Sequence, residues 1–139
     1  MEISPDPKYN NLLVSKFINQ VMKEGKKFLS QKIVYKCFEN VQKKTEKNPL
    51  EIFSQALKSA SPRIETKPRR VGGATYQVPI EVQGDRQVTL AMRWILEATR
   101  KKKGKMEDKL AEELILAAKG EGGAIKKRIN TERMAEENK

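Results

Sequence analysis

The spacing of apolar side chains changes twice along this chain, and no other feature restricts its fold as much. Before Pro62 and after Gly84, apolar residues recur at intervals of about three and four, which is the spacing of one helix face. Between them, the segment Tyr76–Val82 alternates apolar and polar residues, which is the period of a β-strand. Gly72-Gly73 precedes this segment, at a point where a tight turn needs positive φ angles. The pattern therefore predicts a β-hairpin between two groups of helices.

Three helices are expected before the hairpin. The first carries Val14–Met22, and the second begins near Phe28–Ser30 with an apolar face that extends to Val41. Residues 43–48 are predicted to form a polar connector. Asn48-Pro49 is predicted to supply the N-cap and the first residue of the third helix. Most of the core is therefore expected to be helical.

Three further helices are expected after the hairpin. Asp85 is a candidate N-cap of the fourth, and the fifth carries the apolar residues that follow Met106. The last, at about 124–137, is thinly apolar and is expected to be peripheral or to need a partner. Its useful apolar positions are Ile125, Ile129 and Met134. The predicted fold class is mainly α, a bundle of about six helices with a protruding two-stranded β-hairpin between helices three and four.

The hairpin contains a proline in each strand. Pro68 and Pro79 lack the N–H that a strand in the middle of a sheet donates. The strands are therefore expected to form a ribbon that stands alone, and such ribbons are marginally stable in water. We expect an insertion that the core does not need and that is mobile until a partner orders it. The chain is predicted to be a single domain, 1–139, with the hairpin arm at about 63–83 and the helical core at 10–61 and 85–137.

The formal net charge of +11 is unevenly placed along the chain. Residues 63–103 carry ten Lys/Arg against four Asp/Glu, whereas residues 104–139 carry eight of each. An excess of this size indicates an anionic partner, chiefly nucleic acid or an anionic membrane surface. No apolar run approaches membrane-spanning length, and Met1–Pro7 lacks the pattern of a signal peptide. We expect no membrane partner.

Histidine is absent and cysteine occurs once, at Cys37. The side chain best suited to proton transfer near neutral pH is therefore missing, and zinc sites built on Cys/His clusters are excluded. Cys37 and Trp94 both fall within apolar repeats and are expected in the core, and a lone cysteine suits a reducing compartment. Glu112-Glu113 beside Lys109 is interpreted as surface pairing. We expect no enzyme activity, no cofactor, no metal and no small-molecule substrate.

Basic residues crowd the predicted hairpin. A two-stranded ribbon fits a nucleic-acid groove, arginine offers bidentate contacts to phosphate, and an aromatic ring can stack on a base. The alternative is a surface hairpin that uses arginine only for solubility, but like charges would repel on a ribbon already short of stabilising contacts. The candidate RNA-binding residues in this segment are Arg63, Lys67, Arg69, Arg70 and Tyr76.

Two further basic groups lie on predicted helices. Three arginines of the fourth helix are spaced seven residues apart, so they line one stripe that can track a phosphate backbone. The alternative is a solvated helix face. Lysines along and after the first helix can bind RNA or simply complement the helix dipole. These candidates are Arg86, Arg93 and Arg100, and Lys16, Lys23, Lys26 and Lys27.

Several segments resemble one known family, in order along nearly the whole chain. They are Pro5-Asp6-Pro7-Lys8-Tyr9, the Gly25-Lys26-Lys27 turn, Arg69–Val82, Leu90-Ala91-Met92-Arg93-Trp94 and Met134-Ala135-Glu136. Together they resemble the bacterial-type ribosomal protein S7 family of the small subunit. The block from Arg69 to Val82 is long and unusual enough that chance explains it poorly.

The resemblance implies a structural, primary binder of the 3′ major domain of small-subunit ribosomal RNA, which nucleates assembly of the subunit head. It also implies a bacterial-type ribosome, in the cytoplasm or in an organelle, with head and platform proteins as neighbours. The hairpin would reach toward the exit-site tRNA and the mRNA path. By matching motif, the implied RNA contacts are Lys8, Lys16, Lys26, Lys27, Arg69, Arg70, Tyr76, Arg86 and Arg93.

Two other functions are kept as alternatives. An architectural DNA-binding protein with a helical core and a basic β-arm can grip a groove in the same way, and composition alone does not separate it from an RNA binder. An enzyme of RNA modification is disfavoured because the sequence offers neither a cofactor loop nor a catalytic cluster. Competition between folded ribosomal RNA and duplex DNA distinguishes the first two.

Overall fold

Asparagine caps start two of the helices before the hairpin. In the computed structural model, which describes residues 3–22 and 25–139, Asn11 accepts a hydrogen bond from the Leu13 N–H at 2.9 Å and starts α1 (Leu12–Val21). Asn48 accepts from the Leu50 N–H at 3.0 Å and starts α3 (Pro49–Ala60), as the sequence predicts. Between them, α2 (Lys27–Thr45) runs further than expected. Its last turn includes Lys43 and Lys44, whose charges suit a helix C-terminus.

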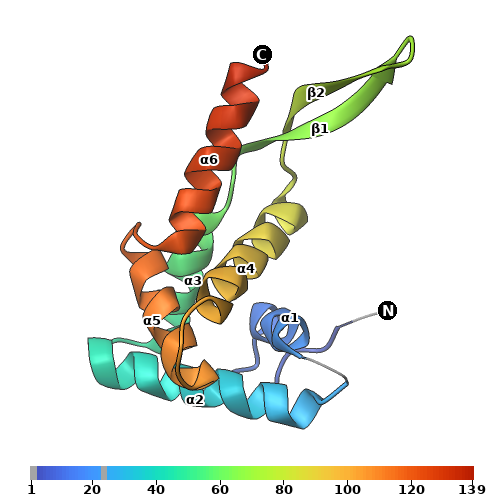
Figure 1. Ribbon diagram of the computed structural model, residues 1–139. Helices are drawn as coiled ribbons and strands as arrows, with labels where there is room; N and C mark the ends of the chain where they lie inside the picture. Colours follow the sequence, from blue (N-terminus) through green and yellow to red (C-terminus); the bar gives the residue numbers. More distant parts are fainter. Residues whose placement is uncertain (1–2, 23–24) are drawn as a thin grey trace.

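The hairpin lies between α3 and α4, where the sequence predicts it. β1 (Ile64–Val71) pairs antiparallel with β2 (Ala74–Glu81), and Gly72-Gly73 forms the turn with φ angles of +56° and +86°. The ribbon projects beyond the helices, with its turn at the far end (Figure 1).

Three helices follow the hairpin: α4 (Gly84–Arg100), α5 (Met106–Ala118) and α6 (Gly123–Glu137). The expected mainly α fold with six helices is therefore confirmed within the described residues. The expected N-cap of α4 is wrong, because Gln83 holds that position. Asp85 lies inside the first turn, where its negative charge interacts favourably with the positive end of the helix dipole.

The core forms where α2, α3 and α5 meet. Phe38 and Phe53 have ring centroids 5.3 Å apart, and Phe17 of α1 lies 5.1 Å from Phe53. Burying each such ring contributes about 1.5–3 kcal/mol. Trp94 and Cys37 are also buried, as expected, and burial raises the pKa of the Cys37 thiol far above its usual value.

The segment before α1 is held by one buried carboxylate. Asp6 accepts hydrogen bonds from the backbone N–H groups of Lys8 (3.1 Å), Tyr9 (2.7 Å) and Asn11 (2.9 Å), and from the Tyr35 hydroxyl (3.0 Å). A buried carboxylate is tolerated when donors surround it in this way. The Pro-Asp-Pro motif therefore fixes the entry into the helical core.

Helix α6 packs through alanines and a glycine. Ile125 is buried, and Ile129 and Met134 remain about half exposed, which agrees with the expectation of a peripheral helix. The other buried positions are Ala124 and Ala135. At Gly123 an added Cβ would lie 2.8 Å from the Cβ of Ala98 in α4. Small side chains thus let α6 approach α4 closely.

The carboxylates of α5 pair with a different lysine from the one that the sequence suggests. Glu113 is buried, and its Oε1 lies 2.7 Å from the Nζ of Lys102, which also lies 3.1 Å from Glu112. Lys109, the expected partner, instead donates to the Lys102 carbonyl at 2.9 Å. This cluster fixes the connection between α4 and α5.

Candidate nucleic-acid interface

The exposed part of the hairpin distributes its basic residues over two faces. Arg69 lies opposite Tyr76, and Lys67 opposite Val78, so these side chains share one face of the ribbon. Arg70 is next in sequence to Arg69 and therefore points to the other face. Arg69, Arg70 and Tyr76 are exposed near the turn, and the Tyr76 ring is accessible for stacking.

The root of the hairpin is fastened to α6 through Arg63. The Arg63 N–H donates to Glu132 Oε2 at 2.7 Å, and its Nη2 donates to Glu136 Oε1 at 3.0 Å. Lys139 and then Arg63 lower the pKa of Glu136 through hydrogen bonds. Arg63 therefore pairs with carboxylates of the protein, although its side chain is exposed.

The root is fastened to α4 through Arg86. Its Nε donates to Glu65 Oε2 at 2.6 Å and its Nη2 to Glu65 Oε1 at 3.0 Å, which is a bidentate pair. The hydrogen bonds from Arg86 hold the pKa of Glu65 below its usual value and raise the pKa of Arg86. We call this pair, together with Arg63–Glu132/Glu136, the root clamps. The expectation of a ribbon standing alone is wrong for the root, because these contacts and the buried Ile64 attach it to the core.

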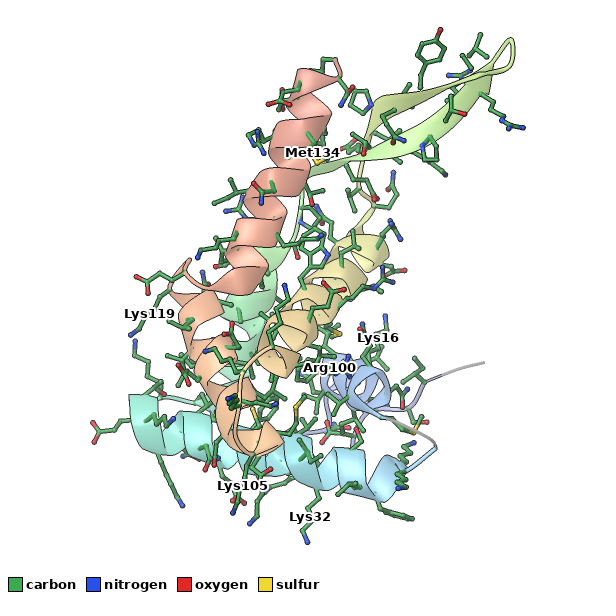
Figure 2. The ribbon with its side chains drawn as sticks, viewed as in Figure 1. Lys16, Lys32, Arg100, Lys105, Lys119 and Met134 are labelled. Carbon is green, nitrogen blue, oxygen red and sulfur yellow. The ribbon has the colours of Figure 1, made fainter. Side chains whose placement is uncertain are left out.

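A second basic group lies where α1 meets α4. Lys16 of α1 and Arg93 of α4 line one shallow hollow on the surface. Gln20 fastens the two helices there, since its Nε2 donates to the Thr89 carbonyl at 3.3 Å. Lys16 projects from α1 in Figure 2. The structure therefore brings together two predicted cations that are far apart in sequence.

A third basic group surrounds the start of α2. Lys26 and Arg100 line one hollow, and Lys109, which the sequence did not single out as a binding residue, lines it too. Lys27 is exposed beside it. Lys23 lies outside the described residues. Arg86, Arg93 and Arg100 are all exposed along α4, as the spacing predicts, but Arg86 is committed to Glu65.

Lys8 lies apart from these groups, against aromatic rings. Its Nζ is 5.6 Å from the Tyr9 ring centroid and 5.3 Å from that of Tyr35, and 3.7 Å from Glu39 Oε1. Burial raises the pKa of both tyrosines, so their rings face the ammonium in the neutral form. Lys8 is half-exposed and remains accessible from outside.

The carboxylates of the root clamps were missed by sequence reasoning. Glu132 and Glu136 lie 69 and 73 residues from Arg63, so no local pattern connects them. Glu65 stands among the basic residues Arg63, Lys67 and Arg69, and nothing in that pattern connects it to Arg86. Among the residues described, seven predicted cations have no carboxylate within ion-pair distance: Lys16, Lys27, Lys67, Arg69, Arg70, Arg93 and Arg100.

The fold and these surfaces define a class, a strongly basic helical protein with a projecting β-hairpin arm. Within 3–22 and 25–139, no group of three or more Cys, Asp or Glu side chains is arranged to hold a metal ion. No helix in the same ranges combines the length and the apolar character needed to cross a bilayer.

Comparison with known proteins identifies the family to which the chain belongs. The family model for ribosomal protein S7p/S5e matches residues 1–139. Small ribosomal subunit protein uS7 of Thermotoga maritima is 56% identical over 139 residues, covering 99% of this chain and 90% of the relative. The proteins of the same name from Thermomicrobium roseum and Caldanaerobacter subterraneus subsp. tengcongensis are 54% and 52% identical, covering 99% of this chain and 88% and 89% of theirs. The chain belongs to the ribosomal protein S7p/S5e family.

Family membership confirms three expectations from the sequence. The chain is a structural component of the small ribosomal subunit that serves translation, and it is not an enzyme. Its bacterial-type relatives give it a cytoplasmic, ribosomal location. The RNA contacts of individual residues remain predictions.

Proposed function

We propose that the chain binds small-subunit ribosomal RNA directly, through the outer half of the hairpin and the Lys16–Arg93 hollow. The observation that carries this proposal is the set of cations without a carboxylate partner among the described residues, all of them exposed except the half-buried Lys16. Such cations remain available to phosphate, and each phosphate contact releases counterions from RNA.

The two faces of the hairpin tip suggest a division of roles. Arg69, Lys67 and Tyr76 share one face, which suits one unpaired base stacked on Tyr76 with its phosphates beside the cations. Arg70 on the other face suits a second strand or the opposite wall of a groove. In this proposal Arg63 and Arg86 position the arm, since both are bonded to carboxylates of the protein.

The RNA target we propose is the 3′ major domain, where binding would nucleate assembly of the subunit head. The arm would then lie near the exit-site tRNA and the mRNA path, with head and platform proteins as neighbours. Support comes from membership of the S7p/S5e family and from the basic projecting arm. An architectural DNA-binding protein shares the basic arm, but no observation favours it over the ribosomal role.

The test replaces Arg69 and Arg70 together by glutamate and measures affinity for a folded fragment of the 3′ major domain. Both residues are exposed and lie outside the root clamps, so the melting temperature should not change. Affinity should fall by at least tenfold, because two attractive charges become repulsive. The matched control reverses two adjacent exposed lysines of α6, Lys126→Glu together with Lys127→Glu, which lie outside the proposed surface and change the net charge equally. Equal affinities of the hairpin variant and the control for the RNA fragment would show that the arm is not part of the RNA interface.

A further inference from the structure

Helix α5 presents apolar side chains on a second face. Leu114 lies in the core, but Ile115 and Leu116 are only half-buried. They line a hollow of about 510 Å³ between α5, the end of α2 and the start of α3, and Ile52 and Ala118 complete its floor. Ile52, Ile115 and Ala118 also pack against the core, and the part of each that lines the hollow is an apolar surface on which a side chain of another molecule can pack.

The rim of this groove is basic. Lys44, Lys47 and Lys119 are exposed along it, and none has a carboxylate within ion-pair distance among the residues described. Glu112 also lines the groove, but its Oε1 lies 3.1 Å from the ammonium of Lys102. A partner with carboxylates beside an apolar side chain therefore matches both the rim and the floor.

The chemistry of the floor favours a protein over RNA. Unpaired bases are held by stacking on aromatic rings or on arginine, and neither lines this groove among the described residues. Apolar centres with a polar rim are typical of protein interfaces. Lys119 also lies on the other side of the molecule from Lys16, which belongs to the proposed RNA surface (Figure 2).

We propose that this groove docks an acidic segment of a neighbouring small-subunit protein. One aliphatic or aromatic side chain of that segment would cover Ile115 and Leu116, and flanking Asp or Glu side chains would pair with Lys47 and Lys119. The proposal depends on membership of the ribosomal family. It does not depend on which residues bind RNA.

The test places a benzophenone amino acid at Gln55, on the edge of the groove, in the full chain assembled into small subunits. Irradiation followed by peptide sequencing should give an adduct to one acidic peptide of a neighbouring protein. The matched control carries the same group at Ser54, the adjacent exposed residue of α3, which lies outside this groove. An adduct to RNA, the same peptide from both positions, or no adduct at Gln55 would overturn the proposal.

A second variant separates docking from folding. Lys47→Glu places a like charge against the acidic segment at an exposed position, so the adduct from Gln55 should fall at least fivefold. The melting temperature and the affinity for ribosomal RNA of the free variant should match those of the unmutated chain. An undiminished adduct in this variant would also contradict the proposal.

Discussion

The Glu65–Arg86 clamp makes a testable prediction about the direction of the hairpin arm. Glu65→Gln keeps the size and shape of the side chain but removes its charge. The amide oxygen of this variant would still accept one hydrogen bond from Arg86, but the bidentate charged pair that measures 2.6 and 3.0 Å would be lost. We therefore expect the root of β1 to separate from α4 more often.

The magnitude follows from the exposure of the two partners. The Glu65 side chain is 13% exposed but that of Arg86 is 51% exposed, so solvent screens the pair in part. Charge-assisted hydrogen bonds contribute about 1.5–3 kcal/mol when buried, and exposed ion pairs about 0.2–1 kcal/mol. An intermediate loss of about 1 kcal/mol shifts the equilibrium toward the detached root roughly fivefold.

The assay is a distance distribution between two spin labels. Thr75→Cys labels the hairpin near its turn and Lys58→Cys labels α3, since both positions are exposed. The native Cys37 is buried and its pKa is raised, so it should not react with the label. We expect a broader distribution for Glu65→Gln than for the unmutated chain.

Glu97→Gln is the matched control, because Glu97 is exposed on α4 and has no cation within ion-pair distance among the described residues. This control should leave the width unchanged. Equal widths in all three proteins would refute the clamp as a determinant of the arm's direction.

Two further predictions follow from the same contacts. Because the folded pKa of Glu65 lies below its unfolded value of about 4.3, the clamp stabilises the root above that pH and is lost as the pH falls through the lowered pKa. The distance distribution of the unmutated chain should broaden in acid, and that of Glu65→Gln should broaden less; identical pH profiles would contradict this. Gly123→Ala should destabilise the fold by about 1–3 kcal/mol, because its Cβ would lie 2.8 Å from that of Ala98, and thermal melting measures this loss. Asn130→Gly, at an exposed position of the same helix, shows the cost of glycine in a helix without any change in packing. An unchanged melting temperature for Gly123→Ala would show that α6 can shift freely.

The position of the hairpin was predictable because its signals are local. Gly72-Gly73 needs positive φ, and the alternation from Tyr76 to Val82 specifies which residues share a face. The first five helices were predictable for the same reason, since each carries its own apolar stripe, whereas that of α6 is thin. The extra length of α2 was missed because Lys43 and Lys44 suit either a connector or a helix end.

The attachment of the hairpin was not predictable from local patterns. Arg63 and Arg86 resemble any other arginine on a basic surface until α6 and β1 place carboxylates beside them. Buried Glu113 was taken for a surface residue in the same way, because its partner Lys102 belongs to another segment. Ion pairs between distant segments depend on the tertiary fold, and a charge pattern alone cannot assign their partners.

The face of α6 was missed for a different reason. The sequence pattern noted the large apolar residues Ile129 and Met134 on a peripheral helix, whereas the close approach to α4 is made at Gly123, opposite Ala98. The two larger side chains stay about half exposed. Small residues at a tight helix crossing carry little signal in a hydrophobic pattern.

The central claim, that the arm binds ribosomal RNA, is tested most directly by a competition measured across a salt titration. The unmutated chain and an Arg69→Gln/Arg70→Gln variant are each titrated with a folded fragment of the 3′ major domain and with duplex DNA of equal length. The account predicts that the RNA fragment is preferred and that log affinity falls with log salt by about 0.7–0.9 per phosphate contacted. The variant should reduce this slope by about 1.4–1.8. A preference for the DNA duplex, or an unchanged slope in the variant, would contradict the claim.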